Sequence, residues 1–285
     1  MRTSSGSEGG RLPNLLIIGK CTTSSLHYYL SFHLQICMSQ KKELDFFAQE
    51  FNWCKGVDWY KSQFTGVAKI YGEASPSYTH HPFFAGVPQR MASLVPDAQL
   101  IYLIRDPIER VISDYIHEVS KNREDRTFTE AVTDFHNNRY LTCSLYSMQL
   151  EQYLQYFSRS QILVLANEEL YAERQQTLEK VFRFLAVDVA FLSEKFNQLR
   201  HQSSDNRRQT ALGLWVARLP IKKMLSHLSP DRQWSYERRI LLPFSREIKR
   251  PQVDPEVRCR LIAYFQDDSG RLQEYAGRKF IGWCV

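Results

Sequence analysis

The chain has little glycine or proline, and it has no long apolar run. Its 285 residues include 12 Gly and 11 Pro, too few for a collagen-like or low-complexity protein. The run at Leu15–Ile18 is followed directly by Gly19 and Lys20, so it is far shorter than a signal-peptide core or a membrane span. Apolar residues make up 43% of the chain, which is enough for a large core. The sequence therefore predicts a globular chain without a membrane span.

The cysteines form no metal-binding or redox motif. No Cys-x-x-Cys pair and no Cys/His spacing typical of zinc occurs, and the spacings are wide. A chain of this size needs no disulfides, which favours free thiols in a reducing compartment. We therefore expect a cytoplasmic protein without a metal. The six cysteines are Cys21, Cys37, Cys54, Cys143, Cys259 and Cys284.

The first 200 residues carry no excess of positive charge, whereas the rest of the chain does. Residues 1–200 contain 21 Lys and Arg against 22 Asp and Glu, and residues 201–285 contain 16 against 9. This imbalance indicates an anionic ligand or surface on the C-terminal side. No dense Lys/Arg run interleaved with aromatic residues is present, which favours a phosphate-bearing small molecule over nucleic acid.

Short apolar runs alternate with helical patterns along the chain, which predicts an α/β fold. Strands are expected at residues 12–19, 69–72, 98–104 and 161–166. Helices are expected at residues 24–34, 90–94, 108–119, 144–157, 178–185 and 251–277. In the last of these, Asp254 is the expected N-cap and Pro255 the first helical residue. Residues 197–209 are expected to form a polar loop.

One folded unit accounts for most of the chain. Residues 1–11 are Gly- and Ser-rich and are expected to form a disordered leader. No linker interrupts the alternation of strands and helices in residues 12–285. The sequence therefore predicts a single α/β domain with a central parallel sheet flanked by helices.

The turn between the first strand and the first helix is the first candidate site. Such a turn presents unpaired N–H groups and the positive end of a helix dipole, which suit an anion. Lys20 adds a positive charge, and four hydroxyl-bearing residues follow it: Thr22, Thr23, Ser24 and Ser25. The alternative is an ordinary capped turn. The segment is not a Walker A motif, because the Gly-x4-Gly-Lys-Ser/Thr spacing is missing.

The second candidate site begins at Arg105, which follows the strand expected at 98–104. A side chain at the carboxyl end of a parallel strand can point into the ligand crevice of an α/β sheet. Ser113 lies two turns inside the next helix, and a guanidinium with a hydroxyl suits a terminal phosphate. The alternative is a surface ion pair of Arg105 or Arg110 with Asp106 or Glu109.

Together with four other segments, these two sites resemble the sulfotransferases that use 3′-phosphoadenosine 5′-phosphosulfate (PAPS). The turn resembles their P-loop-like 5′-phosphosulfate loop, and the Arg105 segment resembles their 3′-phosphate element. The similarity extends over residues 12–283 and is closest to bacterial sulfotransferases related to the heparan-sulfate N- and 3-O-sulfotransferases. The six segments that carry it are GKCTTSSL (19–26), KKELDFF (41–47), GEASPSY (72–78), residues 105–113, SLY (144–146) and residues 277–283.

The resemblance implies a role for each matching residue. Lys20 matches the catalytic lysine, and Glu43 matches the general base of the heparan-type enzymes. Asp45 falls where some of these enzymes have an assisting His, and Glu73 is the alternative base, so both are expected near the acceptor. The implied nucleotide ligands are Lys20, Cys21, Thr22, Thr23, Ser24, Ser25, Arg105, Ser113, Tyr146, Arg246, Lys249 and Arg250.

The implied reaction is an in-line displacement at sulfur. A lysine beside the bridging oxygen stabilises the charge that develops there as the 3′,5′-bisphosphate (PAP) leaves. A carboxylate can take the proton that the acceptor loses, and this scheme needs no metal. The implied acceptor is a hydroxyl or an amine of a small molecule, a glycan or a glycolipid.

Several positions depart from the family pattern. The family loop usually reads Gly-x-x-Lys-x-Gly-Thr-Thr-Ser, whereas here Lys20 follows Gly19 directly and Thr22 stands in place of glycine. Ala74 replaces a lysine, and Glu247 falls where the family has a glycine. The short loop keeps open a homologue that binds the bisphosphate but transfers sulfate slowly or not at all. A P-loop kinase is a third possibility, but the chain has no Walker motif.

Overall fold

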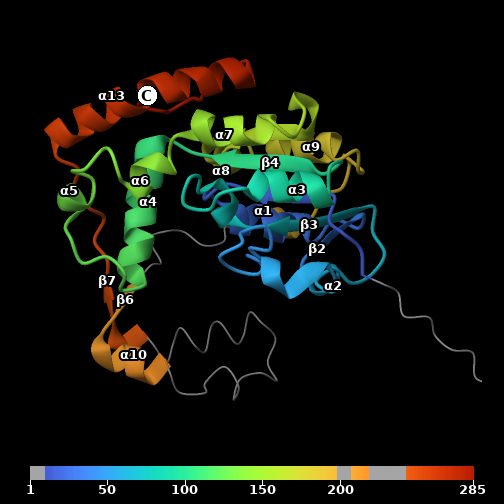
Figure 1. Ribbon diagram of the computed structural model, residues 1–285, viewed down its shortest axis with the longest axis horizontal. Helices are drawn as coiled ribbons and strands as arrows, with labels where there is room; N and C mark the ends of the chain where they lie inside the picture. Colours follow the sequence, from blue (N-terminus) through green and yellow to red (C-terminus); the bar gives the residue numbers. More distant parts are fainter. Residues whose placement is uncertain (1–9, 198–206, 218–241) are drawn as a thin grey trace, which may run out of the picture.

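Five parallel strands form the central sheet in the computed structural model, which describes residues 10–197, 207–217 and 242–285. The strand order is β2-β3-β1-β4-β5, with β1 in the centre (Figure 1). Four of these strands were predicted, whereas β2 was missed because an apolar run of three residues is too short to recognise. The bounds are β1 Leu15–Ile18, β2 Ile36–Met38, β3 Ile70–Ala74, β4 Gln99–Ile104 and β5 Ile162–Ala166.

Both faces of the sheet are covered by helices. Alternate residues of each strand point to opposite faces, so each strand contributes side chains to two separate cores. Leu16 and Ile18 of β1 pack in a core with α2, α3 and α7, whereas Leu15 and Ile17 pack in a second core with α1, α8 and α9. This arrangement confirms the predicted α/β domain with a parallel sheet between helices. The helix bounds are α1 Thr23–Leu30, α2 Gly56–Lys61, α3 Val87–Leu94, α7 Tyr146–Leu154, α8 Asn167–Ala172 and α9 Arg174–Phe184.

A third core joins helices beside the sheet. Ile112 of α4 packs in one cluster with Leu141 of α6 and with Leu261 and Phe265 of α13. The long helix α13 lies across the top of the view in Figure 1, against α4 and α7. The bounds are α4 Pro107–Ser120, α5 Phe128–Ala131, α6 Arg139–Thr142 and α13 Pro255–Ala276.

Helix α13 begins as the sequence predicts. The carboxylate of Asp254 accepts a hydrogen bond from the Glu256 N–H at 2.9 Å, and Pro255 is the first helical residue. The helix is capped after Ala276 by Gly277, whose φ of 65° lies in the left-handed region that glycine adopts without strain.

A small antiparallel pair, β6 Arg207–Gln209 with β7 Ser245–Glu247, corrects one prediction. Residues 207–209 were expected in a loop, yet they form a strand. The prediction was wrong because the partner strand lies far along the chain, so the pairing leaves no pattern in the local sequence. Arg208 donates from Nε to the Asn122 side chain at 2.9 Å, which ties the pair to the C-terminal end of α4 (Figure 1). Asn197 ends a short 3-10 helix, and residues 198–206 of the predicted loop, like residues 1–9 of the predicted leader, lie outside the described residues.

Short elements complete the described part of the chain. They are η1 Trp53–Lys55, η2 Pro76–Thr79, η3 Arg159–Gln161, η4 Glu194–Asn197, α10 Ala211–Ala217 and η6 Leu242–Phe244. In the described ranges, no helix is long and apolar enough to cross a membrane. All six cysteines are free thiols, as the sequence predicts.

Candidate active site

The turn after β1 has two residues with positive φ, Gly19 and Thr22. Gly19 has a φ of 97°, and a Cβ at this position would lie 2.2 Å from the carbonyl oxygen of Leu103. Only glycine fits there. Thr22, the N-cap of α1, has a φ of 49° and a ψ of 17°, so it adopts the left-handed conformation that the usual glycine would supply. The shortened loop therefore keeps a P-loop-like course and opens onto the N-terminus of α1.

The side chains of this turn divide into exposed and buried groups. Lys20, Thr22 and Ser24 are partly exposed, whereas Cys21, Thr23 and Ser25 retain 5% exposure or less. The backbone N–H of Ser25 already donates to the Thr22 carbonyl at 3.0 Å, and the side chain of Cys21 faces Tyr146 in the core. Of the four predicted hydroxyl donors, those of Thr22 and Ser24 belong to the partly exposed residues.

Arg105 lies where predicted, between β4 and α4. One of its terminal nitrogens lies 3.4 Å from Glu109, and its Nε is buried without a hydrogen-bond partner in the described structure. Glu109 in turn forms an ion pair with Arg250 at 2.6 Å. A predicted residue of the C-terminal basic segment thus reaches Arg105 through a shared carboxylate.

Tyr146 supports this region from within the core. Its hydroxyl accepts a hydrogen bond from the Arg105 N–H at 3.2 Å and lies 3.7 Å from the Cys21 sulfur. The residue is 1% exposed. Tyr146 therefore links the first turn to the second candidate site, and this geometry indicates support of the cradle rather than direct contact with a ligand.

The other predicted nucleotide ligands are more scattered. Ser113 is half-buried on α4, whereas Arg246 lies in β7 opposite Arg208, near the C-terminal end of that helix. Lys249 is exposed in the segment between β7 and α13. The three basic residues of the C-terminal segment are therefore not gathered at one point in this structure.

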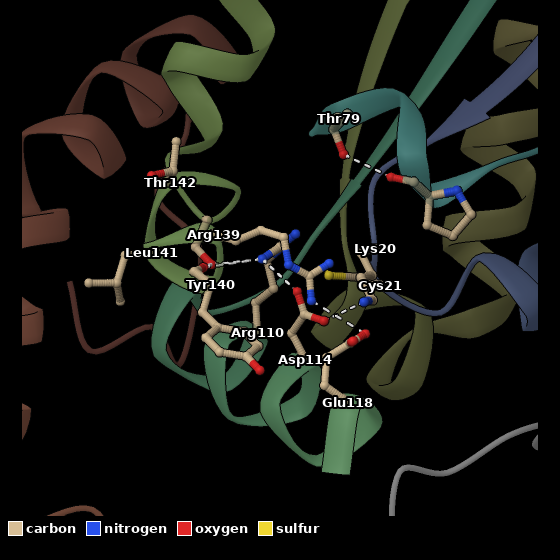
Figure 2. A network of polar contacts seen from close by, with 12 residues as sticks. Lys20, Cys21, Thr79, Arg110, Asp114, Glu118, Arg139, Tyr140, Leu141 and Thr142 are labelled. Carbon is tan, nitrogen blue, oxygen red and sulfur yellow. Dashed lines mark hydrogen bonds and ion pairs between the residues drawn. The ribbon is translucent and has the colours of Figure 1, made fainter. Parts of the chain in front are cut away.

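A network of buried charges lies beside Lys20 and was not predicted (Figure 2). The Lys20 ammonium pairs with Asp114, and a terminal nitrogen of Arg110 lies 3.6 Å from the other oxygen of the same carboxylate. The side chains of Arg110 and Asp114 are each 1% exposed. Next to them, Arg139 pairs with Glu118 at 3.4 Å. The spacing of 110, 114 and 118, which puts three charged residues on one helix face, is the sequence signal that could have revealed them.

The charges around Asp114 determine its ionisation. Burial raises the pKa of this carboxyl, but Lys20, Arg110 and Arg139 outweigh burial and hold the pKa well below its ordinary value. Asp114 is therefore a permanent anion next to three cations.

Two histidines also belong to this neighbourhood and were not predicted. Burial, with Arg110 and Lys20 close by, lowers the pKa of His80 to about 3, so its imidazole is neutral. His117 lies one turn after Asp114 on α4, and burial followed by Lys20 lowers its pKa. Neither histidine stands in a sequence pattern that distinguishes it from a core residue.

Glu43 lies on the exposed side of the site, in the loop after β2. Its N–H donates to the carbonyl of Ala74 at 3.0 Å, which fixes the loop against the end of β3. Burial raises the pKa of its carboxyl, but the ion pair with Lys42 and the charges of His117 and Lys20 lower the pKa below its ordinary value. Glu43 is therefore an exposed, ionised carboxylate whose pKa responds to the charge of Lys20.

Glu73, the alternative base, is sealed in the core. Its carboxylate accepts hydrogen bonds from Tyr60 at 2.5 Å, Tyr78 at 2.7 Å and Ser75 at 2.9 Å. Its exposure is 0%, and burial raises its pKa to about 7. Glu73 therefore has no exposed surface for an acceptor in this structure.

Asp45 lies between Glu43 and the core. It accepts a hydrogen bond from the Ser77 hydroxyl at 2.5 Å, and its own N–H donates to Ser75 at 3.0 Å. Burial raises its pKa. Its backbone is left-handed, with a φ of 47°, as is that of Glu43 at 62°. No group of three or more metal-ligating side chains occurs in the described ranges.

Comparison with known proteins assigns the chain to a family. The family profile described as the sulfotransferase domain matches residues 13–216, and the chain belongs to this family. It is 27% identical to the mouse bifunctional heparan sulfate N-deacetylase/N-sulfotransferase 4, over 94% of this chain and 30% of that protein. It is 30% identical to mouse heparan sulfate glucosamine 3-O-sulfotransferase 5, over 61% of this chain and 54% of that protein.

A solved structure shares the whole fold. The crystal structure of a sulfotransferase from Alicyclobacillus acidocaldarius superposes with a TM-score of 0.68 at 25% identity, over 96% of this chain and 100% of that one. These matches confirm the predicted enzyme class, sulfuryl transfer, and do not favour a homologue that binds nucleotide without transfer. The chain spans less than two thirds of the length of both curated relatives.

Proposed function

We propose that this sulfotransferase takes its sulfuryl group from PAPS and transfers it to a hydroxyl or an amine of a glycan. The observation that carries the proposal is the position of Lys20, which lies at the turn from β1 into α1 beside the buried charges of α4. A positive charge at this turn can act on the bridging oxygen of a phosphosulfate whose phosphate lies at the helix N-terminus.

Three features of the chain fit such a donor. Gly19 lets the turn pass directly against the Leu103 carbonyl of β4, and the chain then enters the N-terminus of α1 at Thr22. The buried Nε of Arg105 is a donor without a partner in the described structure, and an anionic phosphate oxygen would satisfy it. Arg105, Glu109 and Arg250 together keep a net positive charge on the same side, because two guanidinium groups share one carboxylate. Ser113, Arg246 and Lys249 are proposed as further nucleotide ligands.

Glu43 is the proposed base. The acceptor oxygen or nitrogen attacks sulfur, the bond from sulfur to the bridging oxygen breaks, and its electron pair stays on PAP. The acceptor proton passes to the Glu43 carboxylate, while Lys20 stabilises the charge on the leaving oxygen. The exposure of Glu43 and its coupling to Lys20 support this assignment over Glu73, which is enclosed by three hydroxyl donors.

The names of the two curated relatives support a glycan acceptor, since both describe sulfation of heparan sulfate. A small-molecule or glycolipid acceptor is the alternative. The cytoplasmic location and the bacterial source expected from the sequence also remain proposals. The six free cysteines support the first of these.

The test is transfer of radiolabelled sulfate from PAPS to a panel of acceptors. The panel contains an N-desulfated heparan oligosaccharide, a de-O-sulfated one, a neutral disaccharide and a simple phenol. We expect label in an oligosaccharide and its loss in Lys20→Ala, with PAP affinity changed little, because the lysine acts on charge that develops in the transition state. Label in the phenol alone would contradict the glycan proposal, and full activity of Lys20→Ala would contradict the role of Lys20.

A further inference from the structure

Helix α4 buries three charged side chains in one row. Arg110, Asp114 and Glu118 are spaced four residues apart and retain 1%, 2% and 8% exposure. Residues at this spacing lie on one face of a helix, and the face they form here adjoins Lys20 (Figure 2). Charged residues are almost never this deeply buried unless they are paired.

A contribution to the stability of the fold is a weak explanation for this row of buried charges. Burying an ion pair costs desolvation energy that its attraction often fails to recover, and apolar residues of similar size commonly serve as well. The Nη1 of Arg110 that faces Asp114 also donates to the Ser144 hydroxyl at 2.9 Å, whereas its Nη2 is buried without a hydrogen-bond partner in the described residues. The Ser144 contact therefore keeps the positive charge of Arg110 3.6 Å from the Asp114 carboxylate, and the same carboxylate contacts the Lys20 ammonium.

Lys20 needs such a partner. Its side chain is 20% exposed and has four rotatable bonds, so its ammonium has many alternative positions. A charge that is to act on a bridging oxygen must be held close to its productive position before the reaction begins. Asp114 contacts this ammonium directly, whereas Glu118 pairs with Arg139 instead.

We propose that Asp114 is a positioning residue, which orients the Lys20 ammonium toward the sulfuryl donor and is itself held by Arg110. This inference rests on the proposed role of Lys20. Asp114 is not a second base, because the three cations around it keep it ionised and make it a poor proton acceptor. It acts through Lys20 alone.

The first experiment compares Asp114→Asn with Glu118→Gln in steady-state kinetics, PAP calorimetry and thermal unfolding. Both variants neutralise a buried carboxylate of α4 that pairs with an arginine, which is Arg110 of α4 for Asp114 and Arg139 of α6 for Glu118. Asp114→Asn should lower kcat about 10- to 100-fold, as small displacements of catalytic groups do, and should change PAP affinity by less than about threefold. Glu118→Gln should keep kcat within about threefold of wild type. Equal losses of kcat in the two variants would overturn the proposal.

A double-mutant cycle tests whether Asp114 acts through Lys20. In the Lys20→Ala background, adding Asp114→Asn should change kcat by less than about twofold, because the group that Asp114 orients is gone. A further loss as large as that in the wild-type background would show an independent role and overturn the proposal. A Lys20→Ala variant as active as wild type would instead refute the proposed role of Lys20 itself.

Asp114→Glu covers the case in which Asp114→Asn does not fold. It keeps the negative charge beside Arg110 but moves the carboxylate by one methylene group. We expect the thermal midpoint to stay near that of the wild type and kcat to fall about tenfold or more. A folded Asp114→Glu variant with wild-type kcat would count against a positional role.

Discussion

At the scale of the residue, Arg105 is the side chain most suited to a phosphate. Its Nε is buried without a partner in the described part of the chain, and its backbone is fixed by Tyr146. Arg105→Ala should therefore weaken PAP binding about ten- to a hundredfold, the value of one charge-assisted hydrogen bond of about 1.5–3 kcal/mol. The affinity for AMP, which lacks the 3′-phosphate, should change much less. Calorimetry with both nucleotides measures this difference, and equal losses would place the 3′-phosphate elsewhere.

The choice between the two candidate bases is also a question about single residues. Glu43→Gln should lower kcat by about 10² to 10⁴, the usual contribution of a general base, and should leave PAP affinity unchanged. Glu73→Gln should have the smaller effect, because its carboxylate is enclosed by Tyr60, Tyr78 and Ser75. Sulfate-transfer assays at saturating PAPS give both values. A larger loss in Glu73→Gln would make Glu73 the base.

Glu73 should also make the free energy of unfolding depend on pH. Burial raises its pKa to about 7, above the ordinary value of 4.5, so the folded protein holds this proton at pH values where the unfolded chain has lost it. The contribution of Glu73 to the free energy of unfolding is therefore complete below about pH 4.5. It is lost as the pH rises to about 7, and this loss lowers the free energy of unfolding by up to about 3 kcal/mol. Urea unfolding at pH 5 and pH 8 should show this fall in the wild type and a smaller fall in Glu73→Gln. An equal fall of the unfolding free energy in the wild type and in Glu73→Gln would mean that Glu73 is ionised at both pH values.

At the scale of the element, the shortened turn between β1 and α1 contains a threonine, Thr22, in a conformation that favours glycine. Thr22 holds a left-handed backbone, which costs a β-branched residue about 1–2 kcal/mol. Thr22→Gly should remove part of this strain, raise the melting temperature by about 2 °C and tighten PAP binding. Thr23→Gly is the matched control, since Thr23 begins the helix and glycine there should lower the melting temperature. If both variants are destabilised alike, the left-handed turn is not strained.

The elements that could be predicted are those with a local pattern. The apolar run of β4 and the Asp254-Pro255 start of α13 contain their own signals, and both occur as predicted. Strand β6 has none, because its stability depends on β7, which lies far along the chain. The same limit applies to the site. Lys20 and Arg105 follow strands and could be found, whereas the contact between Lys20 and Asp114 exists only once α4 packs beside the first turn.

At the scale of the whole molecule, the end of the chain returns to the site. After α13, Arg278 pairs with Glu169 at 2.8 Å, and the Cys284 N–H donates to Asp106 at 2.7 Å. Asp106 is the N-cap of α4, where it accepts a hydrogen bond from the Glu109 N–H at 3.0 Å. The last residues of the chain therefore help to fix the start of the helix that carries Ser113 and Asp114.

Trp283 connects this end of the chain to the nucleotide side. Its ring centroid lies 5.9 Å from that of Tyr146, whose hydroxyl accepts a hydrogen bond from Arg105 and contacts Cys21. Trp283→Ala should therefore destabilise the fold by about 2 kcal/mol or more and also weaken PAP binding by about 2- to 30-fold, because Tyr146 loses the ring packed against it. Calorimetry below the melting temperature separates the two effects. Ile281→Ala, at a side chain that is 92% exposed, should change neither, and unaltered PAP affinity in folded Trp283→Ala would show that the end of the chain stabilises the fold without shaping the site.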